Sequence, residues 1–137
     1  MSTEHDLPPW LREQLSRLQQ LQQNLQAIMM QKQQVEFEIS ETNKALEEIK
    51  KVDSIDSIYK SAGPLLIKAN KDEVEKDLSE KKELANTRVM VLGKQETRVK
   101  ENLKEVETKI NQMIQGMQQG MQGNPSSSSP PPSSSSS

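Results

Sequence analysis

The sequence has no cysteine and a single histidine. Without cysteine, a disulfide framework and thiolate chemistry are both excluded. His5 alone cannot build a zinc site or a nucleophile–histidine pair within one chain. The few glycines match neither a dinucleotide-binding fingerprint nor a phosphate-binding loop. We therefore expect no enzyme: no catalytic residue, no cofactor and no metal site.

Aromatic residues are almost as scarce, since the chain offers only Trp10, Phe37 and Tyr59. The hydrophobic fraction of 31% is also too low for a globular core of ordinary size. The apolar residues that are present are mostly aliphatic or Met, and they recur with a period among many Gln, Glu and Lys. This composition is typical of long helices and coiled coils.

The sequence also lacks a large excess of charge of either sign and has no long apolar run. The net charge is −2, and no basic patch that would neutralise phosphates is visible, so we expect no nucleic-acid partner. No apolar run is long enough to span a bilayer, so we expect no membrane partner. The opening MSTEHDLPPW lacks the basic and apolar regions of a signal peptide. A cytoplasmic protein is the simplest expectation, and the absence of cysteine suits a reducing compartment.

The chain divides into five segments by composition and periodicity. Residues 1–8 form a flexible N-terminal arm, and residues 9–52 form a first helix that Pro8 and Pro9 introduce. Residues 53–71 connect it to a second helix over residues 72–115, which opens with an N-cap candidate, Asn70. Residues 116–137, rich in Gly, Gln and Met and then in Ser and Pro, are expected to be a disordered tail.

Both predicted helices carry a heptad repeat, with positions labelled a to g. A repeat sustained over this length predicts a left-handed supercoil rather than a single surface helix. In the first helix the a and d positions are Leu11, Gln14, Leu18, Leu21, Leu25, Ile28, Lys32, Val35, Ile39, Thr42, Leu46 and Ile49. In the second they are Leu78, Lys82, Ala85, Val89, Leu92, Glu96, Val99, Leu103, Val106, Ile110, Met113 and Met117.

The similar helix lengths and the connector between them predict a mainly α fold, a long antiparallel two-helix coiled coil. One antiparallel register places Leu46 opposite Leu78 and brings two polar seam residues, Lys32 and Glu96, within one layer of each other. Two readings of these residues stay open. Either they pair and help to set the register, or each side chain extends separately into solvent.

The connector carries two short β-prone runs, Ile58-Tyr59-Lys60 and Leu65-Leu66-Ile67-Lys68, around the turn signal Ala62-Gly63-Pro64. They predict a small β-hairpin, with a flexible loop as the alternative. A lone hairpin is marginal in water and leaves both of its edges open to another chain. We therefore expect it to mediate oligomerisation, and we define the hairpin surface as Ile58, Tyr59, Leu65, Leu66 and Ile67.

The segment IYKSAGPLLIK, between two equal helices of which the second opens at KDEV, resembles the prefoldin β-type subunits. The resemblance spans about residues 9–115 and is most specific at Tyr59, Lys60 and Gly63 with the run that follows them. The step Gly63-Pro64 is similar to the sixth eukaryotic subunit, whereas LPPWLREQ is similar to archaeal β subunits. A single hairpin signal favours the β type, because α-type subunits carry two. The Ser and Pro tail departs from the family pattern.

The resemblance implies an ATP-independent chaperone that binds unfolded client proteins. Two α-type and four β-type subunits would join their hairpins into a hetero-hexamer with a double β-barrel platform. The coiled-coil tips, where both termini of each chain lie, would hold non-native proteins and deliver them to a group II chaperonin. The alternative function is a homo-oligomeric coiled-coil scaffold without client binding.

Apolar residues near both chain ends are the candidates for the client-binding tip. Antiparallel folding would bring the two sets together, and Met suits a surface that accepts many partners. Ordinary coiled-coil core is the alternative for several of them. We define the terminal surface as Trp10, Leu11, Leu15, Ile110, Met113, Ile114 and Met117.

Overall fold

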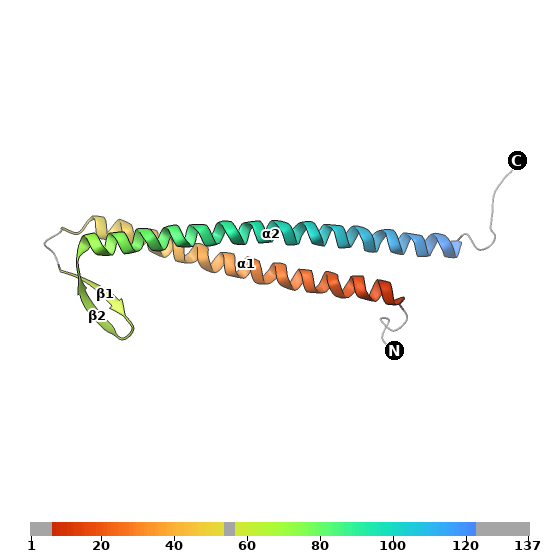
Figure 1. Ribbon diagram of the computed structural model, residues 1–137, viewed down its shortest axis with the longest axis horizontal. Helices are drawn as coiled ribbons and strands as arrows, with labels where there is room; N and C mark the ends of the chain where they lie inside the picture. Colours follow the sequence, from red (N-terminus) through yellow and green to blue (C-terminus); the bar gives the residue numbers. More distant parts are fainter. Residues whose placement is uncertain (1–6, 54–56, 123–137) are drawn as a thin grey trace, which may run out of the picture. The chain divides into compact units, whose positions relative to one another are not determined.

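The computed structural model describes residues 7–53 and 57–122. Its elements follow the order helix α1 (Pro9–Lys50), strand β1 (Ile58–Ala62), strand β2 (Leu65–Ala69) and helix α2 (Lys71–Gln122) (Figure 1). The predicted architecture, two long helices with a small antiparallel β-hairpin between them, is therefore confirmed.

Each helix begins where a local signal satisfies its first backbone N–H groups. The carbonyl oxygen of Pro8 accepts hydrogen bonds from the N–H groups of Leu11 and Arg12, at 3.1 and 3.0 Å. Pro9, which has no N–H to leave unpaired, occupies the first helical position of α1. At α2 the side-chain oxygen of Asn70 accepts from the N–H of Asp72 at 2.8 Å. Asn70 is thus the N-cap, as predicted.

The helix ends differ from the predicted boundaries. Helix α1 ends at Lys50, slightly before the predicted end at residue 52. Helix α2 continues to Gln122, past the predicted end at residue 115, so the first part of the predicted disordered tail is helical. This segment alternates Gly116 and Gly120 with Met and Gln, which are good helix formers. The cost of about 1 kcal/mol for each glycine does not end a helix that is already formed. The arm residues 1–6 and the Ser/Pro tail lie outside the described residues.

The chain divides into two compact units, and each contains a stretch of both helices. One comprises Met1–Leu25 with Arg98–Ser137 and is called the terminal unit below. Its core contains Leu11, Val106 and Ile110, and the half-buried Leu7, Leu15, Leu18 and Leu21 pack against this cluster. These contacts place the start of α1 beside the second half of α2 within the unit.

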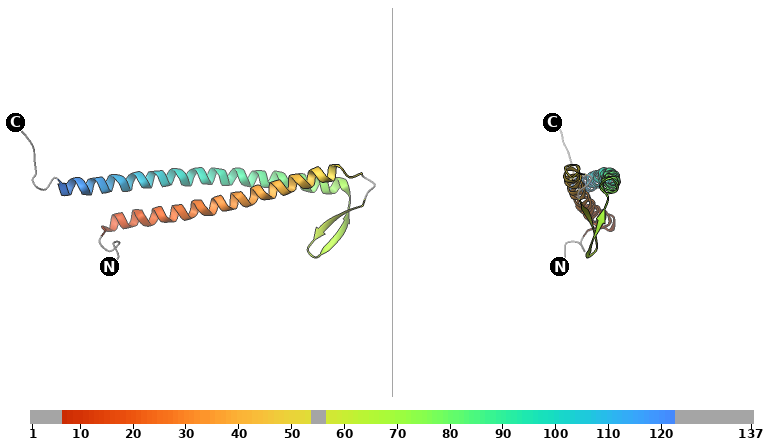
Figure 2. Two further views of the ribbon diagram at one scale, coloured as in Figure 1. Left: turned by 180° about the vertical axis from the view of Figure 1, so that it is seen from behind. Right: turned by 90° about the vertical axis from the view of Figure 1, so that its left-hand side faces the viewer.

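The second unit, Gln26–Thr97, is called the hairpin unit. Its core contains Val35, Ala85 and Leu92, with Ile28, Ile39 and Val89 packed around them. All six occupy predicted a or d positions, so the aliphatic seam lies where the heptad pattern placed it. The two helical segments lie side by side in opposite directions (Figure 2). Two ion pairs agree with this antiparallel arrangement. Lys32 pairs with Glu96, and Glu38, which lies later on α1, pairs with Arg88, which lies earlier on α2.

The hairpin joins β1 and β2 as an antiparallel two-stranded sheet, in which Ile58 pairs with Ala69 and Ala62 pairs with Leu65. Only Gly63 and Pro64 connect the strands. Gly63 has a φ of 61°, in the left-handed region that glycine enters without steric cost. Glycine at the first central position is typical of a two-residue hairpin turn, and the fixed φ of proline suits the second.

Candidate functional site: the hairpin surface and the terminal surface

The hairpin surface is almost entirely open to solvent. Leu66 is 74% exposed, and Tyr59, Leu65 and Ile67 also have large exposed fractions. Only Ile58, at the start of β1, is half-buried. Contiguous exposed aliphatic side chains are unusual on a monomeric protein and mark an interaction site. The strands themselves carry this surface, since the helices of the same unit cover little of it.

The strand register sorts these residues onto two faces of the sheet. Successive side chains of a strand point to opposite faces, and paired residues share a face. Because Lys60 pairs with Ile67, one face carries Leu65 and Ile67 together with Ile58. The other face carries Tyr59 and Leu66. Both faces of the sheet are therefore partly apolar, so a partner chain can cover either face or both.

The hairpin also presents backbone donors and acceptors. In the part of the chain that the structure describes, the sheet has only two strands, so each strand has one edge without a strand neighbour. Such an edge can pair with a strand of another chain. Exposed apolar faces and open edges together provide the side-chain and the main-chain contacts that an intermolecular sheet requires.

A contact between the two helix ends supports the base of the hairpin. The ammonium group of Lys71, the first residue of α2, donates a 2.6 Å hydrogen bond to the carbonyl oxygen of Val52, just after α1. A cation is favourable at a helix C-terminus, where carbonyl groups lack partners. This contact holds the end of α1 near the start of α2, and the sequence analysis did not identify it.

The terminal surface divides into buried and exposed residues. Leu11 and Ile110 are only 3% and 7% exposed and belong to the core of the terminal unit. Leu15 packs against the same core, and Met113 is half-buried. As placed here, these four side chains serve mainly to hold the two helices together.

Three residues of the terminal surface remain accessible. Trp10 is 41% exposed, and Ile114 and Met117 are exposed to a similar extent. Ile114 and Met117 lie one helical turn apart on α2 and therefore share a face. Trp10 lies in the first turn of α1, next to the buried Leu11. The structure thus retains a smaller apolar surface than the sequence pattern suggested, with a packed core beneath it.

The terminal unit also contains a polar defect. Gln14 occupies a d position, and its side-chain oxygen is buried without a hydrogen-bond partner among the described residues. A buried acceptor of this kind costs about 1–3 kcal/mol. The helix pairing in this unit is consequently weaker than an aliphatic residue at the same position would make it.

The polar residues of the seam in the hairpin unit do meet. The Lys32 ammonium lies 3.1 Å from Glu96 Oε1, which resolves the two open readings in favour of pairing. Both side chains are partly buried, so this contact is screened less than a surface pair. A paired polar layer inside an aliphatic seam favours one register over its neighbours.

Six further large apolar residues are exposed in the hairpin unit, and the sequence analysis did not identify them as a surface. They are Met29, Met30 and Phe37 on α1, and Leu84, Met90 and Val91 on α2. None occupies an a or d position. Their position outside the heptad seam is visible in the sequence and already indicates that these apolar side chains are exposed.

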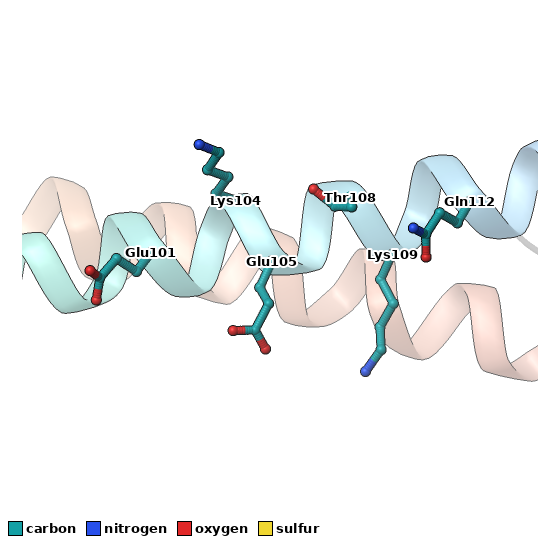
Figure 3. A pocket seen from close by; sticks show the side chains of 6 residues that line it. All are labelled: Glu101, Lys104, Glu105, Thr108, Lys109 and Gln112. Atoms are coloured by element: carbon teal, nitrogen blue, oxygen red, sulfur yellow. The ribbon is translucent and has the colours of Figure 1, made fainter.

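A shallow hollow on α2 is lined by Glu101, Lys104, Glu105, Thr108, Lys109 and Gln112, all on one helix and open to solvent (Figure 3). Within residues 7–53 and 57–122, no group of three acidic or histidine side chains lies close enough to bind a metal ion. No helix in the same ranges combines the length and hydropathy needed to cross a membrane.

Comparison with known proteins agrees with this geometry. The family described as "Prefoldin subunit" matches residues 12–117. The chain is 40% identical over 109 residues to the prefoldin subunit beta of Archaeoglobus fulgidus. The aligned region covers 80% of this chain and 94% of that protein. It is 38% identical over 120 residues to the prefoldin subunit beta of Caldivirga maquilingensis. The aligned region covers 88% of this chain and 98% of that protein.

Solved structures give the same result. The crystal structure of the prefoldin beta subunit from Thermococcus strain KS-1 matches with a TM-score of 0.71 and 37% identity, covering 77% of this chain and 93% of that chain. The prefoldin beta2 subunit from the same strain matches with a TM-score of 0.60 and 26% identity, over 66% and 97% of the two chains.

Proposed function

This chain belongs to the prefoldin family as a β-type subunit, and we propose that it acts in an ATP-independent chaperone that holds non-native proteins. In this proposal it works in the cytoplasm, performs no catalysis of its own and delivers its clients to a group II chaperonin. The exposed hairpin carries the proposal, because a subunit that presents two apolar faces and two open edges is built to be completed by other subunits.

Assembly would proceed through the hairpin surface. Strands of neighbouring subunits would pair with the open edges of β1 and β2 and cover both faces of the sheet. Burial of each of Leu65, Leu66 and Ile67 would contribute roughly 1.5–3 kcal/mol. The proposed product is a hetero-hexamer of two α-type and four β-type subunits.

Client holding would use the exposed part of the terminal surface, Trp10, Ile114 and Met117. A non-native protein exposes apolar segments of no fixed sequence, so a matching surface should be apolar, adaptable and repeated. Each contact contributes only about 1 kcal/mol, but several subunits that hold one client multiply the effective affinity. No nucleotide is needed in this proposal, because each single contact is weak and forms and breaks reversibly without an energy input.

Co-expression with an α-type prefoldin subunit tests the proposal. We expect native mass spectrometry to detect a defined hexamer of both subunits, and light scattering to record suppressed aggregation of a denatured client without nucleotide. A stable homo-oligomer that ignores the α-type subunit and protects no client would instead establish the coiled-coil scaffold. An assembled hexamer that protects only in the presence of ATP would contradict the proposed mechanism.

A further inference from the structure

The outer face of α1 in the hairpin unit carries large apolar side chains that the coiled coil does not use. Met30 and Phe37 are each 65% exposed, and the neighbouring Met29 is about half exposed. Phe37 is the only phenylalanine of the chain. A solvated helix face normally carries charged or polar residues instead. These three residues belong neither to the hairpin surface nor to the terminal surface.

The heptad positions place these residues in one stripe. Met30 and Phe37 occupy successive f positions, on the side of α1 directed away from the seam that Ile28 and Val35 form. Met29 lies beside them at an e position. A shallow groove beside Met29 and Met30 extends from this side of α1 to the seam, where Lys32 and Glu96 line it. Met30 and Phe37 therefore share one side of α1, two turns apart with Gln33 and Gln34 between them.

The charges around this stripe are biased toward acid. Between residues 18 and 43 of α1 the only basic residue is Lys32, and its ammonium binds Glu96 at 3.1 Å. The same stretch contains Glu36, Glu38 and Glu41. Glu38 faces Arg88 at 3.8 Å, and Glu41 forms an exposed pair with Lys44 at 3.5 Å. Glu36 and Glu41 are exposed on either side of Phe37, although Glu41 shares its charge with Lys44.

We propose that this face binds a basic amphipathic helix of a partner protein. The i and i+7 spacing of Met30 and Phe37 matches the apolar stripe of a second helix laid along α1. The flexible side chains of Met29 and Met30 adapt to different apolar anchors. Lysine or arginine residues beside those anchors then meet Glu36 and Glu41, which selects a basic partner over an acidic one. This binding is independent of client holding by the terminal surface.

Fluorescence anisotropy on the assembled complex tests the inference with designed peptides. The first probe is a labelled leucine–lysine peptide whose leucines form one helical face. The second replaces every lysine by glutamate, and the third scrambles the leucine–lysine sequence so that no apolar face forms. Met30→Gln with Phe37→Gln removes the apolar stripe, and Glu36→Gln with Glu41→Gln removes the accessible acids. Leu84→Gln with Val91→Gln is the matched control, because it removes exposed apolar side chains from α2 of the same unit.

We expect the unmodified complex to bind the basic helix and to prefer it over the other two peptides. The stripe variant should weaken this binding by about tenfold or more, as expected for central apolar anchors. The acid variant should weaken it by about threefold and reduce its salt dependence, as expected for exposed charges. The α2 control should stay within about twofold, because its substitutions lie outside the contact.

Three results would overturn the inference. Unchanged affinity in the stripe variant would exclude Met30 and Phe37 as the contact. Equal binding of the scrambled peptide would assign the face to extended client segments. Preference for the acidic helix would contradict the charge argument. Circular dichroism of every variant provides the folding control, and we expect unchanged helicity because all the substituted residues are exposed.

Discussion

The hairpin and the terminal unit present apolar residues in different ways. On the hairpin, Tyr59, Leu65, Leu66 and Ile67 are all exposed, and no core of its own lies beneath them. In the terminal unit, Leu11 and Ile110 are buried with Val106, and only a rim of apolar residues remains accessible. Two helices can bury their shared seam between themselves, whereas a two-stranded sheet needs further strands. The hairpin is thus incomplete without partners, while the terminal unit is already packed.

This difference predicts separate consequences of substitution. Changes in the hairpin surface should affect assembly, because its partners supply the missing burial. Changes in the exposed rim of the terminal unit should affect client holding, because the core beneath the rim is independent of it. Changes in the helix interiors should affect only stability.

The largest effect is expected for Leu66→Asp with Ile67→Asp. The two residues lie on opposite faces of the hairpin, so the variant places a carboxylate on each face. Burying these charges in a shared sheet without partners is prohibitively costly. Sedimentation velocity should show that the hexamer is lost while circular dichroism shows retained helicity. The control Asn86→Asp with Gln95→Asp adds the same charge at exposed positions of α2 and should assemble. A normal hexamer from the hairpin variant would remove this surface from the interface.

The second effect concerns Trp10→Ser, Ile114→Ser and Met117→Ser in combination. Leu11 and Ile110 stay unchanged, so the core of the terminal unit remains intact. We expect a several-fold loss of protection against aggregation, because each lost contact of about 1 kcal/mol is multiplied over several subunits. Light scattering of a denatured client without nucleotide measures it, with sedimentation to verify the hexamer. If the variant protects as well as the parent protein, clients bind at another surface.

A smaller effect should follow from Gln14→Leu. Leucine at this d position removes the unpartnered buried oxygen and fills the same seam with an aliphatic side chain. The free energy of unfolding of the terminal unit should rise by about 1–2 kcal/mol. Hydrogen exchange of the amides near the start of α1 can detect this change locally. Faster exchange in the variant would indicate that the Gln14 amide is better satisfied in solution than in this structure.

Gly63→Ala and Gly93→Ala form a matched pair with the smallest effects. An added Cβ meets nothing within 4 Å at either position, so only the backbone distinguishes them. Gly63 has a φ of 61°, and alanine there should destabilise the hairpin by about 1–2 kcal/mol. Gly93 lies inside α2, and alanine there should stabilise the protein by about 0.5–1 kcal/mol. Thermal unfolding of the two variants should shift in opposite directions, and a shift of the same sign would refute the comparison.

Much of the fold was predictable because it depends on local and periodic signals. The heptad repeat alone assigns Val35, Ala85 and Leu92 to the seam, and all three are buried there. The turn signal at Gly63 and Pro64 placed the hairpin, and Asn70 marked the start of α2. The segment around Tyr59 and Gly63 identified the prefoldin family, which the comparisons with known proteins then established.

Other features depended on the three-dimensional arrangement. Whether Lys32 and Glu96 meet depends on the register and on side-chain rotamers across two helices, so the sequence left both readings open. The C-terminal end of α2 was predicted too early, because glycine weakens a helix without necessarily ending it. Leu11 and Ile110 occupy a positions, so the sequence left open whether they belong to the seam core or to the terminal surface, and the packing of the terminal unit buries them.

The sequence by itself determined the order of the elements, the aliphatic seam and the family, because periodicity and turn chemistry are encoded in neighbouring residues. The tertiary structure decided which apolar residues of the terminal surface stay accessible: Trp10 is exposed, whereas Leu11 is buried. It also placed Ile58 on the same face of the hairpin as Leu65 and Ile67, because the strand register decides which residues of β1 share a face with those of β2. Exposure is a property of the packed chain as a whole, and the proposed functions of this protein depend on it.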